Sequence, residues 1–109
     1  MSKITTHVLD AVLGRPAAGV AIRLEQQDGA NWLAVAQSST DADGRCRDLP
    51  DQADAGIYRL VFDPGVYLGR SGRRSIYPEI TITFICGDDA HYHLPLILSD
   101  NSYTTYRGS

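Results

Sequence analysis

The stretch Glu79–Cys86 reads E-I-T-I-T-F-I-C and indicates the fold more clearly than any other. Ile80, Ile82 and Phe84 alternate with the side chains between them, which is the period of a β-strand with two distinct faces. Gly87 and the two aspartates after it favour a turn. We therefore expect a strand here, followed at once by a change of direction.

Similar segments recur on the N-terminal and C-terminal sides of this stretch. Residues such as Gly, Pro, Asp and Asn, which favour turns, separate them. The expected strands cover residues 4–9, 20–26, 32–40, 57–62, 79–86 and 91–98. Many short strands at such intervals are typical of an all-β sandwich or barrel.

One short helix is expected between Pro64 and Arg70. Asp63 is a suitable N-cap, and proline suits the first position of a helix because its missing N–H is not needed there. Gly69 or Gly72 would end the helix. The basic run Arg70–Arg74 that follows is expected to be a solvated loop.

Length and composition predict one globular unit. The chain has 109 residues, which fits a single domain over residues 1–109. No apolar run is long enough to cross a bilayer, so we expect no membrane association. The net charge of −3 argues against nucleic acid as a partner, because binding a phosphate backbone needs a basic surplus. The N-terminal residues lack the apolar core of a secretory signal, which predicts a cytoplasmic protein.

Cys46 and Cys86 are expected to be free thiols, because a cytoplasmic compartment is reducing and their spacing matches no disulfide framework. Arg45 and Arg47 flank Cys46 and could lower its pKa, as a catalytic cysteine would require. We prefer the interpretation that Cys46 is a partly buried, inert thiol.

His7 and His93 are candidates for acid–base chemistry, because imidazole titrates near neutral pH. Strand alternation places His7 opposite the likelier core side of its segment, and it places His93 opposite a leucine face. Two outward-facing histidines from different parts of the chain could converge at one site. The alternative is that His7 is an ordinary surface or interface residue.

His91 and His93 share one face of the expected strand 91–98, a spacing that several zinc sites use. A third ligand would have to come from His7, Asp88 or Asp89, and no tight cluster of carboxylates or cysteines supplies it. The alternative is that His91 caps the turn and His93 works alone. We expect no metal and no other cofactor.

Arg45 follows the turn residues Asp43 and Gly44, so the turn should hold its guanidinium in a fixed direction. A guanidinium is a planar fork that binds oxyanions with two parallel hydrogen bonds. The chain has no glycine-rich phosphate loop, serine elbow or paired-carboxylate motif. Any chemistry is therefore expected to use histidine and arginine.

The C-terminal residues 103–109 keep β-favouring side chains, from Tyr103 to Tyr106, almost to the last residue. Chain ends usually fray, so we expect this end to be held in a sheet or against a partner. A held end would place Arg107 and the hydroxyl and carboxylate of Ser109 at a fixed point.

Four segments together resemble the 5-hydroxyisourate hydrolases, transthyretin-related enzymes of urate breakdown. They are Thr6–Asp10 (T-H-V-L-D), Gly44–Arg45, His91–Leu96 (H-Y-H-L-P-L) and Tyr106–Ser109 (Y-R-G-S). The terminal tetrapeptide is the most specific, because transthyretin, the hormone carrier of the same fold, lacks it and has other residues at the histidine positions. Just upstream, Asp100 is among the residues that depart from the family pattern.

The resemblance implies a two-sheet antiparallel sandwich with one short helix, assembled as a homotetramer (a dimer of dimers) with active sites where dimers meet. It implies hydrolysis of 5-hydroxyisourate, a small-molecule substrate, at the amide bond of its six-membered ring to give 2-oxo-4-hydroxy-4-carboxy-5-ureidoimidazoline. The residues implied as catalytic are His7, Arg45, His93 and Ser109, and those implied to bind substrate are Leu9, Pro95, Tyr106, Arg107 and Gly108. The alternative is a transthyretin-like protein that binds a small ligand without transforming it.

Overall fold

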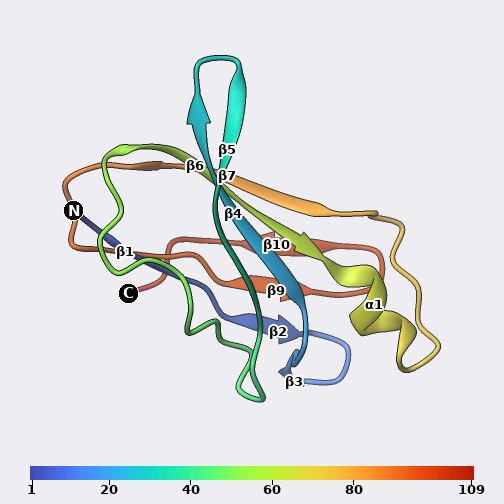
Figure 1. Cartoon of the computed structure of the whole chain (residues 1–109). Coiled ribbons are helices and arrows are strands. Elements are labelled where there is room, and N and C mark those ends of the chain that lie inside the picture. Colours follow the sequence, from blue (N-terminus) through green and yellow to red (C-terminus); the bar gives the residue numbers. More distant parts are fainter.

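Two layers of β-strands face each other in the computed structural model, which describes residues 1–109 (Figure 1). Ile80–Cys86 form strand β7, as the alternation predicted: Ile80 and Ile82 are buried, whereas Ile85 is exposed. β7 lies at one edge of a four-stranded antiparallel sheet with the order β5-β4-β6-β7. The other strands of this sheet are β4 (Ala21–Asp28), β5 (Asn31–Ser39) and β6 (Gly56–Asp63).

The second layer contains a four-stranded sheet with the order β10-β9-β2-β3 and the separate pair β1-β8. Its strands are β1 (Lys3–Thr5), β2 (Val8–Asp10), β3 (Arg15–Pro16), β8 (His91–His93), β9 (Leu96–Leu98) and β10 (Tyr103–Thr105). The expected strands 4–9 and 91–98 are thus each divided into two short strands. Pro95 lies in the second break and has no N–H to donate to a ladder.

The sandwich and its single short helix are confirmed, with two exceptions to the antiparallel arrangement. β1 pairs with β8, and β2 with β9, in parallel. Parallel neighbours need a long connection between them. Here most of the chain, including the whole first sheet, lies between the two segments. The first and last parts of the sequence therefore lie side by side (Figure 1).

The core lies between the two layers and is built from the apolar faces that alternation predicted. Ile4 and Val8 from the N-terminal strands are fully buried, as are Leu60 of β6 and Leu96 of β9. Burying one such side chain contributes about 1.5–3 kcal/mol. The opposite face of the N-terminal strands, which carries His7, is therefore turned away from the core.

Helix α1 (Pro64–Gly69) begins as predicted. The carboxylate of Asp63 accepts a hydrogen bond from the backbone N–H of Gly65 at 3.0 Å, and Pro64 occupies the first turn. Gly72, just beyond the helix, has a φ of +71°, which glycine adopts without strain. No helix of the structure has the length and apolar character needed to cross a membrane.

The basic run after α1 is not the fully solvated loop that was expected. The side chain of Arg73 is only 14% exposed and bonds the buried carboxylate of Asp10 at 2.6 Å and that of Asp100 at 2.7 Å. Tyr67 donates a further hydrogen bond to Asp10 at 2.7 Å. Burial by itself raises the pKa of Asp10, but the hydrogen bonds from Arg73 and Tyr67 outweigh it and hold that pKa well below its usual range. These four residues are called the Asp10–Arg73 cluster below.

Both cysteines are free, as predicted, and both are buried. Burial raises the pKa of the Cys46 thiol, and the charges of Asp41 and Asp48 act in the same direction. The lowering of this pKa that the flanking arginines suggested is therefore wrong, because loss of water on burial disfavours the thiolate. This supports an inert Cys46.

Candidate active site

His91 and His93 lie on the outer face of β8, the strand that pairs with β1. The parallel register aligns Thr5 with His93 and Lys3 with His91. The Thr5 hydroxyl oxygen lies 2.6 Å from Nε2 of His91 and 2.7 Å from Nδ1 of His93. A single hydroxyl on β1 thus fixes both imidazole rings. The predicted shared face of the two histidines is confirmed.

His7 lies in the break between β1 and β2 and is held by the turn before Arg45. Its ring Nε2 lies 2.7 Å from the carbonyl oxygen of Asp43. The backbone N–H of Val8 donates to the carbonyl of Gly44 at 2.8 Å, and His7 and Arg45 form an isolated β-bridge. A carbonyl oxygen can only accept, so Nε2 of His7 carries a proton, and the neutral ring presents Nδ1 as its basic nitrogen.

Asp41, the first residue of the turn that carries Arg45, closes this turn with its side chain. The carboxylate of Asp41 accepts hydrogen bonds from the backbone N–H groups of Asp43 at 2.9 Å and of Arg45 at 3.1 Å. Gly44 has a φ of +77°, and a Cβ there would collide with the carbonyl oxygen of Val8. The turn is therefore pressed against the strand that carries His7, which only glycine allows at this position.

The guanidinium of Arg45 has no hydrogen bond and no ion pair within the chain. Arg47, two residues further on, bonds the carboxylate of Asp41 at 2.9 Å. The side chain of Arg45 instead lines a cavity beside the histidines. An unpaired guanidinium in such a place is available to an anionic ligand.

The C-terminal end is held, as the sequence predicted. β10 pairs with β9, and the backbone N–H of Gly108 donates to the carbonyl of His93 at 2.8 Å. A Cβ at Gly108 would lie only 2.7 Å from Cδ2 of His93, so the glycine lets the chain end pack directly against the imidazole ring. This contact brings Ser109 to the same cavity as Arg45.

The cavity has a volume of about 370 Å³ and is predominantly polar. Its lining residues are Lys3, Thr5, Thr6, Arg45, Cys46, His91, His93 and Ser109. Three of the four residues expected to be catalytic therefore line one space. His7, the fourth, adjoins it through the β-bridge to Arg45.

His93 is the histidine whose titration the fold changes. Burial lowers the pKa of its imidazole below the usual value, and the positive charge of Arg45 lowers it further. His91 and His7 act in the same direction when they are charged. His93 is therefore neutral at pH 7, the state in which an imidazole accepts a proton.

The five residues expected to bind substrate do not line this cavity. Gly108 packs on His93, as described above; Leu9 is half-buried in β2, Pro95 is buried, and Tyr106 is exposed. The guanidinium of Arg107 bonds Asp89 at 2.9 Å and lies over the ring of Tyr92, 4.5 Å from its centroid. Within one chain, Arg107 therefore packs against β8, the strand that carries His91 and His93.

The structure has no group of three or more His, Cys, Asp or Glu side chains placed to hold a metal ion. Nε2 of His91 and Nδ1 of His93 are both hydrogen-bonded to Thr5. The zinc alternative thus has no third ligand in this chain.

Comparison with known proteins assigns the fold to a family. Residues 4–108 match the family model described as HIUase/Transthyretin. The chain belongs to this family. It is 42% identical over 113 residues to the 5-hydroxyisourate hydrolase of Mus musculus, covering 99% of this chain and 96% of the relative. It is also 42% identical to the 5-hydroxyisourate hydrolase of Caulobacter vibrioides, over the whole of both chains.

Solved structures similar to this chain include a 5-hydroxyisourate hydrolase and a transthyretin. The Klebsiella pneumoniae 5-hydroxyisourate hydrolase superposes with a TM-score of 0.88 at 35% identity and covers 99% of this chain and 100% of its own. Transthyretin from Sparus aurata gives a TM-score of 0.92 at 32% identity and covers 99% and 97%. The fold is therefore shared by proteins with different names, and only the site residues can distinguish them.

Sequence reasoning missed Lys3 and Thr5 as residues of the site. Thr5 had a signal, because it precedes His7 by two positions and thus shares its strand face. Its contact with the two C-terminal histidines had none, because it depends on the pairing of β1 with β8.

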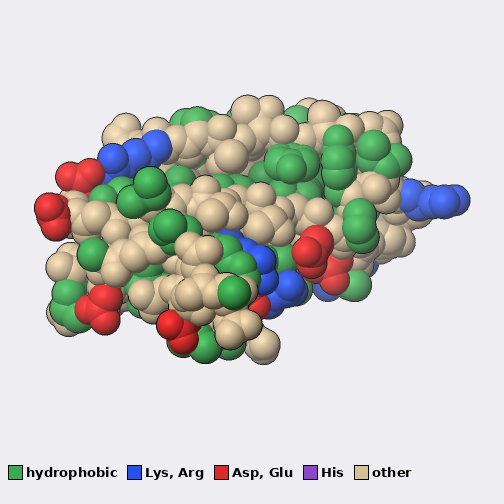
Figure 2. Space-filling view, turned by 90° about the horizontal axis from the view of Figure 1, so that it is seen from above, with side chains coloured by type: hydrophobic (Ala, Val, Ile, Leu, Met, Phe, Trp, Pro, Cys, Tyr) green, Lys and Arg blue, Asp and Glu red, His purple; other side chains and the backbone are tan.

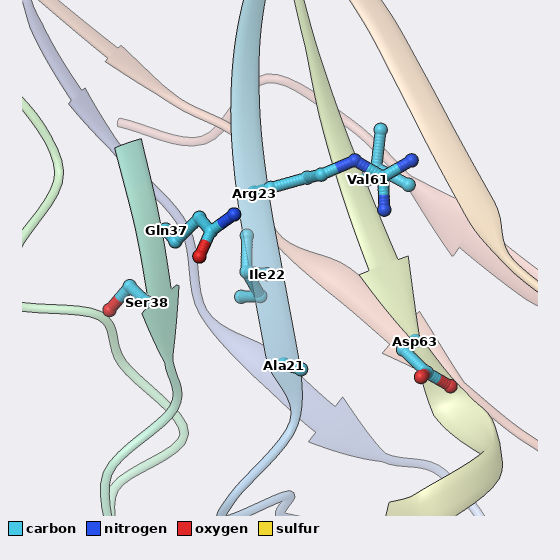
Figure 3. A pocket seen from close by; sticks show the side chains of 7 residues that line it. All are labelled: Ala21, Ile22, Arg23, Gln37, Ser38, Val61 and Asp63. Atoms are coloured by element: carbon cyan, nitrogen blue, oxygen red, sulfur yellow. The ribbon is translucent and has the colours of Figure 1, made fainter. Parts of the chain in front are cut away.

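A second hollow, of about 220 Å³, lies on the outer face of the β5-β4-β6 sheet (Figure 3). Arg23 extends across it toward Val61, and Gln37 and Asp63 stand at its sides (Figure 3). Arg23 is paired with Glu25 at 3.4 Å. In the view from above no histidine is visible (Figure 2). This hollow has none of the acid–base groups of the candidate site.

Proposed function

We propose that this chain is a hydrolase that opens the six-membered ring of 5-hydroxyisourate at its amide bond, in urate breakdown. The observation that carries the proposal is the shared cavity of an unpaired guanidinium, Arg45, a neutral imidazole, His93, and the end of the chain at Ser109. Full-length relatives at 42% identity that bear the name 5-hydroxyisourate hydrolase support it.

In the proposed reaction, His93 takes a proton from a water molecule, whose oxygen attacks the ring carbonyl. The guanidinium of Arg45 stabilises the negative charge that develops on the carbonyl oxygen. The carbon–nitrogen bond then breaks, and the proton that His93 took up passes by way of the His7 imidazole to the leaving nitrogen, which returns His93 to its neutral form. The ring is opened and one end becomes a carboxylate, as in 2-oxo-4-hydroxy-4-carboxy-5-ureidoimidazoline.

The end of the chain completes the site in this proposal. Gly108 holds Ser109 beside His93, where its hydroxyl can orient the ring or the water. The substrate is flat and rich in carbonyl oxygens, which suits the fork of Arg45 at one edge. A positioned base accelerates such a reaction by roughly 10²–10⁴-fold and an oxyanion donor by about 10²–10³-fold.

We further propose that the site is completed by assembly into a homotetramer, a dimer of dimers. β7 and β10 each lie at the edge of a sheet and have one unpaired side, which can pair with a symmetry mate. The substrate-binding residues that do not line the cavity of one chain, Leu9, Pro95, Tyr106 and Arg107, could then serve the site of a neighbouring chain. Light scattering tests this, since a stable monomer would contradict it.

The function is tested by following the absorbance of freshly generated 5-hydroxyisourate with and without the protein. We expect His7→Ala and His93→Ala each to reduce kcat by about two orders of magnitude or more, because each removes a proton-transfer group. Urea unfolding of both variants checks that the fold is kept. Near-normal turnover by either variant would remove that histidine from the mechanism.

The same assay separates the enzyme from a carrier. The high similarity to transthyretin structures favours ligand binding without turnover as the second candidate. If the unmodified protein leaves the spontaneous decay of 5-hydroxyisourate unchanged, the carrier interpretation replaces the proposal.

A further inference from the structure

One hydroxyl lies between two imidazoles in the candidate site. The oxygen of Thr5 is 2.6 Å from Nε2 of His91 and 2.7 Å from Nδ1 of His93, and both distances are those of hydrogen bonds. No other hydrogen bond of the Thr5 side chain or of either ring is present. The three side chains therefore form a row joined by two hydrogen bonds, in which the direction of one bond constrains the direction of the other.

The number of protons limits the directions that these two hydrogen bonds can take. A hydroxyl carries one proton, so Thr5 can donate to only one of the two rings and must accept from the other. When both rings are neutral, two arrangements remain. In the first, His93 donates through Nδ1–H to Thr5, and Thr5 donates to His91. In the second, every bond runs in the opposite direction.

The two arrangements give His93 opposite chemistry. In the first, the proton of His93 is on Nδ1, and the lone pair of Nε2 is free to accept a proton. In the second, Nε2 already carries the proton, and the only lone pair of the ring faces Thr5. Only the first arrangement lets His93 act as a base through Nε2, the ring nitrogen that has no hydrogen-bond partner in the protein.

We propose that Thr5 is a positioning residue that holds His93 in the tautomer protonated on Nδ1, with His91 as the acceptor at the far end. This inference rests on the proposed function, because it concerns the base of that reaction. When Nε2 of His93 accepts a proton from water, Nδ1–H already donates to Thr5. The hydrogen bonds among His93, Thr5 and His91 then keep their directions during the proton transfer.

The backbone keeps the three groups in place. Thr5 and His93 are direct partners in the β1–β8 pairing, so the hydroxyl and the ring share one face at a fixed separation. Gly108 packs against Cδ2 of His93 and supports the ring from the other side. His93 is half-buried, which limits the water that could replace Thr5 as partner of Nδ1.

The test compares Thr5→Val, which keeps the shape of the side chain but removes the hydroxyl, with Thr5→Ser, which keeps the hydroxyl. In the unmodified assembled protein, ¹⁵N NMR of the histidine rings, at a pH where they are neutral, should show His93 protonated on Nδ1. Thr5→Val should shift His93 toward the tautomer protonated on Nε2 and reduce kcat about tenfold, since one orienting hydrogen bond is lost. Thr5→Ser should restore both properties.

The outcomes separate this inference from the proposed function. A His93 ring protonated on Nε2 in the unmodified protein would overturn the inference whatever the variants do. An unchanged tautomer and kcat in Thr5→Val would also overturn it, while leaving the hydrolase assignment intact. If the unmodified protein does not accelerate ring opening at all, the proposed function fails, and the NMR spectra still decide whether Thr5 sets the tautomer.

Discussion

Two arginines beside the N-terminal strands illustrate two uses of the same side chain. Arg73 is 14% exposed and bonds the carboxylates of both Asp10 and Asp100. Arg45 lies on a turn between β5 and β6 that bridges to His7, is exposed, and has no side-chain partner in the chain. The first guanidinium is satisfied by the fold, whereas the second is left open.

The difference separates a structural site from a functional one. A buried carboxylate such as Asp10 needs a cation, because an unpaired charge away from water is costly. The Asp10–Arg73 cluster supplies that cation within the chain and ties the loop after α1 to β2. The exposed guanidinium of Arg45 imposes no such cost and remains available to bind a ligand. Charges that a fold leaves unpaired beside a perturbed histidine are therefore good markers of chemistry.

The largest expected effect would break the structural half of this comparison. Arg73→Met should lower the free energy of unfolding by about 3–5 kcal/mol, because the carboxylate of Asp10 stays buried without its partner. Urea unfolding at pH 7 measures this. Arg74→Met is the matched control, since Arg74 is adjacent, exposed and unpaired, and should change stability by less than about 0.5 kcal/mol. Equal losses in both variants would contradict a special role for Arg73.

The second effect tests the functional half. Arg45→Met should reduce turnover of 5-hydroxyisourate by about 10²–10³-fold, because the developing oxyanion loses its donor. Its free energy of unfolding should change by less than about 0.5 kcal/mol, since no contact of the guanidinium within the chain is lost. Arg74→Met again serves as the control and should keep full turnover. A large loss of stability in Arg45→Met would show that this arginine is structural.

The smallest effect concerns the coupling of Arg45 to His93. The pKa of His93 is lowered by burial and by Arg45, so its neutral form persists below the usual value of about 6.5. Activity that depends on this base should fall as the pH drops through the lowered pKa. Arg45→Met removes one positive charge and should move the pKa upward, which NMR titration of the His93 ring measures. Arg47→Met is the control: that guanidinium is tied to Asp41, and the His93 pKa should stay where it is.

Much of the local structure could be predicted from single segments. Alternation in residues 79–86 identified β7 and its buried face, and Asp63 and Pro64 marked the start of α1. These features depend on contacts between residues close in the chain or on a choice of face, so a short window contains the information. The turn at Gly44 was recognised for the same reason.

The missed features all depend on partners that are distant in the sequence. Arg73 was expected in a solvated loop because its partner Asp10 lies 63 positions away. Thr5 was missed because its histidine partners lie 86 and 88 positions away. No local pattern distinguishes a paired arginine from a solvated one, since the same residue types serve both.

The sequence by itself determined the strands, the helix start, the faces turned toward the core and the identity of the residues able to do acid–base chemistry. Periodicity and residue chemistry are local properties, which is why they can be read along the chain. Only the tertiary structure decided that Thr5 would join His91 to His93, that Arg73 would be paired with Asp10 and that Arg45 would remain free. The contact of Thr5 follows from the parallel pairing of β1 with β8. The places of Arg73 and Arg45 follow from loops of distant sequence that pack against the N-terminal strands.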